Sequence, residues 1–143
     1  PRTRGRRWPR KLRRRQPLAR IGHLDLRVRY GGSGGNLPLF RKFYLGGSRT
    51  IRSLDEKSLM GEQMILGNLE YVPDMVTAVF RPYLFYDVGK TAGHDEGLFD
   101  DGAFRSSIGL GLQLGGAIRI MVAKSLDDGD AAPNPWVTIG DAF

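Results

Sequence analysis

The sequence contains no cysteine and no long apolar run. Without cysteine in any of the 143 residues, disulfides and thiolate metal sites are excluded. No stretch reaches the roughly 18 apolar residues of a transmembrane helix, and no apolar segment near the start resembles a secretory signal peptide. Sustained helical periodicity is missing as well. The compartment stays open at this point, because many envelope proteins also lack cysteine.

Positive charge is concentrated at the start of the chain. Residues 1–16 contain nine Lys/Arg and no acid, whereas the remaining 127 residues contain 13 Lys/Arg and 15 Asp/Glu, so the net charge of +7 belongs to this segment. Such a run either binds phosphate or anionic lipid or is a solvated, self-repelling tail. No aromatic stacking platform accompanies it. We expect a disordered basic tail over residues 1–20 and one domain over residues 21–143.

From residue 21 onward, apolar and polar side chains alternate with a period of two. This alternation is typical of strands whose two faces meet different surroundings. Turn-rich segments separate the runs. The sequence predicts an all-β fold, an antiparallel meander of about six strands. The clearest runs are residues 23–30, 62–72, 78–88, 104–114 and 118–123.

A soluble sandwich and a membrane barrel both show alternation, and three features favour the barrel. The runs match a tilted bilayer crossing of roughly 9–11 residues. The polar faces carry charges that suit a wet lumen better than a dry core, namely Arg27, Arg29, Arg81, Asp87, Arg105 and Arg119. Aromatic residues near strand ends suit interfacial girdles, namely Tyr30, Tyr71, Phe104, Trp136 and Phe143.

Three short segments carry a more specific signal. Residues 43–54 read FYLGGSRTIRSL, residues 85–89 read FYDVG, and residues 137–143 read VTIGDAF. In this order they resemble the sixth-loop motif, a late-strand motif and the closing strand of the outer-membrane barrel-assembly and two-partner-secretion superfamily, the bacterial surface antigen family. The resemblance covers roughly residues 37–143. It implies the C-terminal part of a transmembrane β-barrel in the cell outer membrane.

The resemblance also implies an ion pair between a loop and the barrel wall. Arg52 would be the loop arginine that folds into the lumen, and Asp87 its partner; otherwise Arg52 is an ordinary exposed loop residue. Ser53 and Leu54 depart from the family motif, which has glycine and an aromatic there. The remaining implied residues are Phe43, Gly46, Gly47 and Ile51 in the loop motif, Phe85 and Gly89 in the strand motif, and Val137, Ile139, Gly140 and Phe143 in a C-terminal assembly signal.

The expected strands are too few to close a barrel, which needs about 8. An open sheet leaves unpaired edges that lipid cannot satisfy. We therefore expect this chain to be the C-terminal piece of a longer protein, or a truncated relic. Its implied partners are outer-membrane lipid, the missing N-terminal barrel strands, the barrel-assembly machinery, and substrate outer-membrane or secreted proteins.

No pattern indicates catalysis, a metal or a cofactor. His23 and His94 are far apart, and residues 127–130 lack the spaced ligands of a calcium loop. Gly-Lys-Thr at residues 89–91 lacks the first glycine of a phosphate-binding loop, so we read Gly89 as a strand end. The family resemblance implies protein assembly or translocation without covalent chemistry. The alternative is a soluble basic-tailed β-domain that binds nucleic acid; otherwise no nucleic-acid partner is expected.

Overall fold

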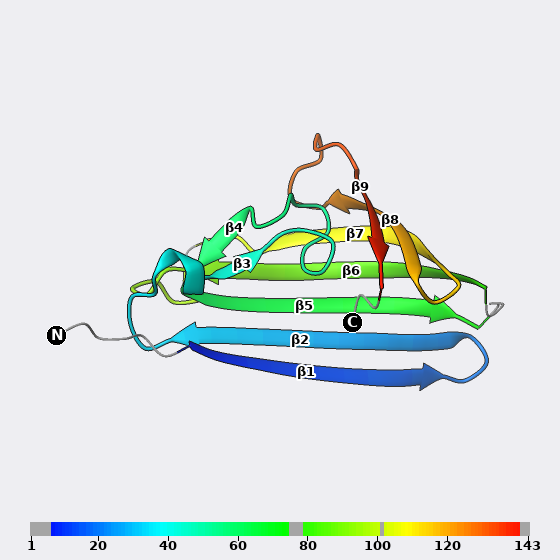
Figure 1. Ribbon diagram of the computed structural model, residues 1–143, viewed down its shortest axis with the longest axis horizontal. Coiled ribbons are helices and arrows are strands. Elements are labelled where there is room, and N and C mark those ends of the chain that lie inside the picture. Colours follow the sequence, from blue (N-terminus) through cyan, green and yellow to red (C-terminus); the bar gives the residue numbers. More distant parts are fainter. Residues whose placement is uncertain (1–6, 75–78, 101, 141–143) are drawn as a thin grey trace.

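The computed structural model describes residues 7–74, 79–100 and 102–140, and within them the regular elements are strands apart from one short 3-10 helix. Seven strands form one antiparallel sheet in the order β1-β2-β5-β6-β7-β8-β9, and β3 and β4 form a separate pair (Figure 1). The predicted all-β meander is confirmed, with one strand more than expected in the main sheet. The elements are β1 (Arg7–Leu18), β2 (Gly22–Ser33), the short 3-10 helix η1 (Leu39–Arg41), β3 (Phe43–Leu45), β4 (Leu59–Gly61), β5 (Gln63–Pro73), β6 (Phe80–Ala92), β7 (Arg105–Leu114), β8 (Ile118–Ser125) and β9 (Asn134–Ile139).

Strand β1 corrects the expectation of a disordered tail over residues 1–20. Residues 7–18 pair with β2 along their whole length, from Arg7 opposite Ser33 to Leu18 opposite Gly22. Both faces of β1 carry arginine, so the alternation that marks the other strands is hidden in the sequence. The basic segment is therefore a strand of the sheet over its described part.

The two faces of the sheet differ as the alternation predicts. Large apolar side chains stand exposed on the outer face, and charged side chains are buried on the inner face. Exposed apolar area on this scale suits contact with lipid. Among the described residues, no helix has the length and apolar character that a membrane crossing requires. The outer set includes Leu26, Leu69, Leu84, Tyr86, Ile108, Leu110, Ile120 and Val137; the buried inner set includes Asp25, Arg27, Asn68, Glu70, Asp87, Ser107 and Arg119.

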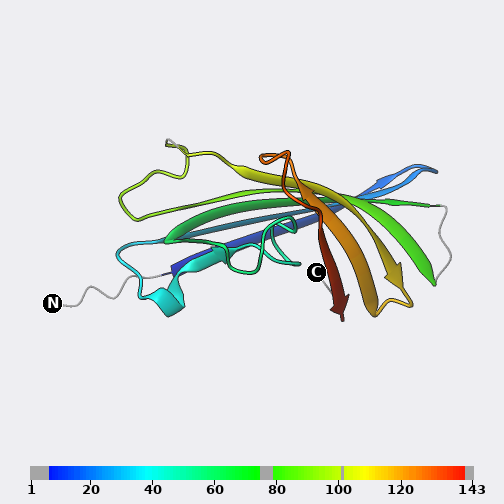
Figure 2. The same cartoon turned by 90° about the horizontal axis from the view of Figure 1, so that it is seen from above.

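The sheet is curved, and the segment between β2 and β5 lies on its concave side. In Figure 2 the sheet forms a trough that covers β3 and the teal loop, and β8 and β9 turn down on the same side. This segment packs through a small apolar cluster that includes Phe43, Leu45, Ile51 and Leu66.

The two ends of the sheet differ in the length of their connections. We call the end with the connections 34–62 and 126–133 the loop end, and the end with 19–21 and 115–117 the turn end.

Aromatic rings cover glycines on neighbouring strands of the inner face. Tyr83 pairs with Gly111 and Phe85 with Gly109 across β6 and β7. A Cβ atom added to Gly109 would lie 2.2 Å from the Val122 carbonyl oxygen and 2.3 Å from the Phe85 ring. The ring thus occupies the space that a side chain would need, which fixes the register of the two strands.

One detail of β6 corrects the sequence reading, and another shows how a proline fits the strand. Gly89 does not end the strand, because β6 continues to Ala92 and the Gly-Lys-Thr segment pairs with β5. Pro82, which as proline favours an edge, lies inside a strand of the sheet. It is tolerated where β6 pairs with β7 alone, since pairing with β5 extends only to Leu84.

We expect Gly109→Ala to lower the thermal stability of the barrel domain, because the added methyl group must displace backbone or the Phe85 ring. Overpacking of this kind costs about 1–3 kcal/mol. The measurement is the temperature at which the folded, heat-modifiable band is lost on gels. Gly129→Ala is the matched control, because nothing lies within 4 Å of a Cβ atom added there. Equal midpoints for the two variants would contradict the close ring contact.

Candidate functional site

The loop of residues 46–58 is shaped to bring one arginine back to the sheet. Gly46 and Gly47 adopt φ of 111° and 103°, which only glycine reaches without strain. The Gly47 amide donates to the Leu54 carbonyl at 2.9 Å and closes the loop. Ile51 anchors it in the apolar cluster. A side chain at Gly89 would meet Ile51 Cδ1 at 3.2 Å, so the strand-motif glycine admits the loop to the wall.

Arg52 and Asp87, the pair implied by the sequence, are in direct contact. The Arg52 Nε donates to Oδ2 of Asp87 at 2.9 Å and Nη2 donates to Oδ1 at 2.8 Å. The backbone amide of Arg52 also donates to Oδ2, at 3.1 Å. Arg52 is 2% exposed and Asp87 0%. This two-pronged geometry uses the planar fork of the guanidinium, which lysine cannot reproduce.

A second carboxylate completes the environment of Arg52. Its Nη1 donates to Oε1 of Glu70 at 2.6 Å, and the other oxygen of Glu70 accepts from Nη2 of Arg119 at 2.9 Å. The Phe85 ring covers the guanidinium, with Cζ of Arg52 3.7 Å from the ring centroid. The strand-motif phenylalanine therefore contributes a cation–π contact as well as covering Gly109.

The Asp87 carboxylate is held by the wall independently of the loop. Asn68 Nδ2 donates to its Oδ1 at 2.7 Å, and the Ser107 hydroxyl donates to its Oδ2 at 3.2 Å. Asn68 in turn accepts from Nη2 of Arg27 at 2.8 Å, and Arg27 also donates to the Arg49 carbonyl at 2.8 Å. The wall thus orients the acceptor before the loop arrives, and it holds the backbone of the loop too.

Burial makes the pairing obligatory for these charges. Removing a guanidinium from water is costly, and only nearby carboxylates with good geometry offset that cost. Burial lowers the pKa of Arg52, but the hydrogen bonds and charges of Asp87 and Glu70 raise it further, and the resulting pKa lies above its ordinary value. Arg52 therefore stays charged, and the docked loop is fixed by electrostatics rather than by apolar packing alone.

Trp136 of β9 is attached to the same loop residue, which corrects its assignment to an interfacial girdle. Its indole Nε1 donates to the Arg52 carbonyl oxygen at 2.7 Å. Trp136 lies on the inner face and packs against a cluster formed by Tyr83, Phe85, Met121 and Ala123. The last strand and the pinned loop are thus joined by one hydrogen bond.

The other implied residues divide between the site and the outer face. The departure at Ser53 leaves its buried hydroxyl without a hydrogen-bond partner among the described residues, yet the loop tip still packs, with Leu54 against the apolar cluster. Val137 and Ile139 stand exposed on the outer face of β9. Gly140 has φ of 98° just beyond that strand. Phe143 lies outside the described residues.

Sequence reasoning did not assign the supporting residues of the site. Glu70, Asn68, Ser107 and Arg119 stood on the polar faces of the predicted strands, which was the available signal. Their convergence depends on the register: Asn68 lies opposite Asp87, which lies opposite Ser107. A single sequence does not fix that register. No group of three or more potential metal-ligating side chains occurs among the described residues.

The architecture defines a class of protein. A curved antiparallel sheet with an apolar outer face, a charged inner face and an inward loop pinned by a buried ion pair is part of a transmembrane β-barrel. The Omp85 superfamily domain matches residues 14–133. The chain therefore belongs to the Omp85 superfamily, as the three motifs indicated; proteins of this superfamily are outer-membrane proteins. No curated protein matches the sequence.

We expect Arg52→Ala and Asp87→Ala to destabilise loop docking to similar degrees, by about 3–5 kcal/mol each, because each removes the bidentate contact and leaves its buried partner with incomplete charge pairing. The double variant should be little worse than either single variant. The measurement is the rate of trypsin cleavage after Lys57, which is exposed in the same loop. Arg49→Ala is the control, since it removes an exposed arginine of that loop. Fully additive effects of the two substitutions would contradict direct pairing.

We expect Trp136→Phe to loosen the loop by about 1 kcal/mol, because it removes the indole donor and keeps an aromatic ring. Trypsin cleavage after Lys57 should accelerate about fivefold. Trp8→Phe is the matched control, because Trp8 is 53% exposed on the edge strand. If both variants cleave at the same rate, the bond from Trp136 to the Arg52 carbonyl does not hold the loop.

Proposed function

We propose that this chain is the C-terminal barrel segment of an outer-membrane protein that inserts proteins into the membrane or moves them across it. The observation that carries the proposal is the Arg52–Asp87 contact, in which an inward loop is fixed to the barrel wall by a buried pair. Membership of the Omp85 superfamily supplies the context. The protein acts without covalent catalysis, and the barrel itself performs the work.

The docked loop occupies part of the barrel lumen. Residues 46–58 rest on the inner face of β5 and β6, and Arg52 reaches Glu70 and Asp87 on these strands. A loop held in this position limits the free passage and covers the charged wall. We infer that a substrate polypeptide is handled at the wall and at the barrel seam, rather than flowing through an open pore.

The seam lies at the last strand of the sheet. The edge of β9 that faces away from β8 has no partner strand among the described residues. In a closed barrel this edge pairs with the first strand of the barrel. Opening of that join would offer a template edge to an incoming strand, in the manner of β-augmentation. Residues 136–140 form one side of it. The C-terminal residues, of which 141–143 lie outside the described part of the chain, serve as the signal that barrel-assembly machinery reads.

The basic segment supports this proposal over nucleic-acid binding. Arg15 is engaged with Asp25 through two hydrogen bonds of 2.8 and 2.9 Å. Arg13 projects from the same inner face of β1. Although β1 is exposed, its pairing with β2 makes it a strand of the sheet rather than a separate basic arm, and Arg13 and Arg15 lie on the concave side.

We expect the protein to sediment with outer membranes and to resist extraction by alkaline carbonate. In cells that depend on it, Arg52→Ala should reduce the amount of assembled outer-membrane proteins or of a secreted partner, because the loop is released. Glu56→Gln is the control, an exposed change in the same loop. A soluble location with salt-dependent DNA binding would favour the nucleic-acid function instead.

A further inference from the structure

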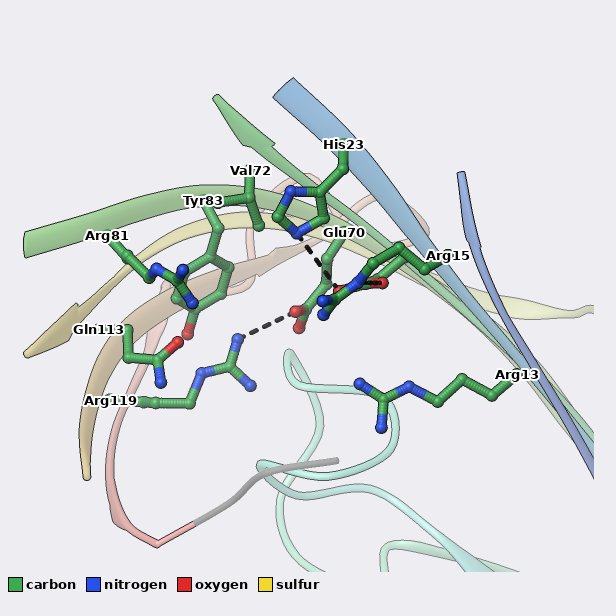
Figure 3. Close-up of a pocket in the computed structure, with 10 residues that line it drawn as sticks. Arg13, Arg15, His23, Glu70, Val72, Arg81, Tyr83, Gln113 and Arg119 are labelled. Atoms are coloured by element: carbon green, nitrogen blue, oxygen red, sulfur yellow. Dashed lines mark hydrogen bonds and ion pairs between the residues drawn. The ribbon is translucent and has the colours of Figure 1, made fainter. Parts of the chain in front are cut away.

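A pocket on the inner face at the turn end is separate from the loop contact, although Glu70 borders both. It has a volume of about 290 Å³ and is lined from six strands, β1, β2, β5, β6, β7 and β8. In Figure 3 the side chains of Tyr83, Gln113 and Arg119 converge on one wall, and Arg13 reaches toward them from the other. The pocket shares Glu70 and its partner Arg119 with the loop-docking site.

The pocket carries an excess of positive charge. Arg13, Arg15, Arg81 and Arg119 line it against two carboxylates, a formal excess of two positive charges. Both carboxylates are already engaged within the wall. Asp25 accepts from Arg15 through both oxygens, and Glu70 accepts from Arg52 and Arg119. Charges of one sign that line a cleft concentrate their field on whatever enters.

The hydroxyl group of Tyr83 is a buried hydrogen-bond donor in the pocket without an acceptor among the described residues. The Tyr83 residue is 3% exposed, and its hydroxyl donates no hydrogen bond to any described residue. Arg81 lies two residues away on the same face of β6 and forms no ion pair with a described carboxylate. Buried polar groups are nearly always satisfied in folded proteins, so a hydroxyl without an acceptor at the wall of a cavity points to a ligand.

We propose that this pocket binds the acidic side chains of a polypeptide that enters the barrel from the turn end. A carboxylate matches the arginine forks and accepts the Tyr83 hydroxyl hydrogen bond. The volume fits one or two side chains with their backbone, and is too small for a folded partner. This inference rests on the proposed function, since it names the class of segment that a protein-handling barrel would hold.

The test exploits the absence of cysteine from this chain. Gln113→Cys places a single thiol of this segment in the pocket of the full-length protein in outer-membrane vesicles. The measured quantity is the ratio of the labelling rate with anionic sulfonatoethyl methanethiosulfonate to that with cationic trimethylammonioethyl methanethiosulfonate. The exposed control is Ala117→Cys, in the turn at the same end. We expect the ratio to be about tenfold higher at Gln113→Cys than at the control. Equal reagent ratios at the two positions would overturn the proposal.

Ligand class is tested by protection of the same thiol. A short oligoglutamate peptide should slow labelling, and oligoglutamine of the same length should not. Tyr83→Phe, which keeps the ring, and Arg81→Gln should each weaken protection about fivefold. Arg105→Gln, an arginine outside the pocket, should leave protection unchanged. Equal protection by inorganic phosphate, or insensitivity to both pocket variants, would overturn the assignment to acidic polypeptide.

Labelling does not depend on assembly activity, so the two proposals fail separately. Loss of charge selectivity in a protein that still assembles substrates removes the pocket alone. The opposite result is that the pocket keeps its charge selectivity while the Arg52→Ala variant shows no defect in assembly or secretion. This result would contradict the proposed function. It would also remove the reason to identify the acidic ligand as a substrate.

Discussion

The structure depends on one buried guanidinium. Arg52 cannot lie inside the trough unless carboxylates meet it there, and Asp87 and Glu70 do so from neighbouring strands. Their positions require the register of β5 and β6. The register of β6 with β7, which brings Ser107 to Asp87, is supported by the rings that cover glycines on β7. The docked loop therefore requires the aligned strands, and the strand alignment supplies the carboxylates that the loop arginine needs. Such agreement between local sequence and overall fold is typical of natural proteins.

Much of the fold could be predicted because alternation is a local property. The expected runs correspond to β2, β5, β6, β7 and β8, and the motif segments placed the loop and the last strand. Strand β1 escaped prediction because both of its faces are basic. Its inward-facing charges are recognisable as part of a sheet only once their partners are known. Arg15, for example, donates to Asp25, ten residues further along the sequence. Composition alone reads such a segment as a solvated tail.

The site could be predicted in part for the same reason. The resemblance to family motifs predicted the pair Arg52 and Asp87, because a motif records the residue types that recur at its positions. Glu70, Asn68 and Ser107 carry no motif, and their convergence depends on register across three strands. Trp136 near a strand end suggested a girdle; its inward direction follows from the phase of β9, which a short strand with weak alternation does not reveal.

The bond between Trp136 and the Arg52 carbonyl makes the loop and the last strand thermodynamically linked. Any ligand or strand that draws β9 away from its present position must also give up that hydrogen bond, and so weakens the docking of Arg52. Because such coupling is reciprocal, release of the loop must by the same free energy favour movement of β9. Loop docking and the position of β9 are therefore coupled through this one hydrogen bond.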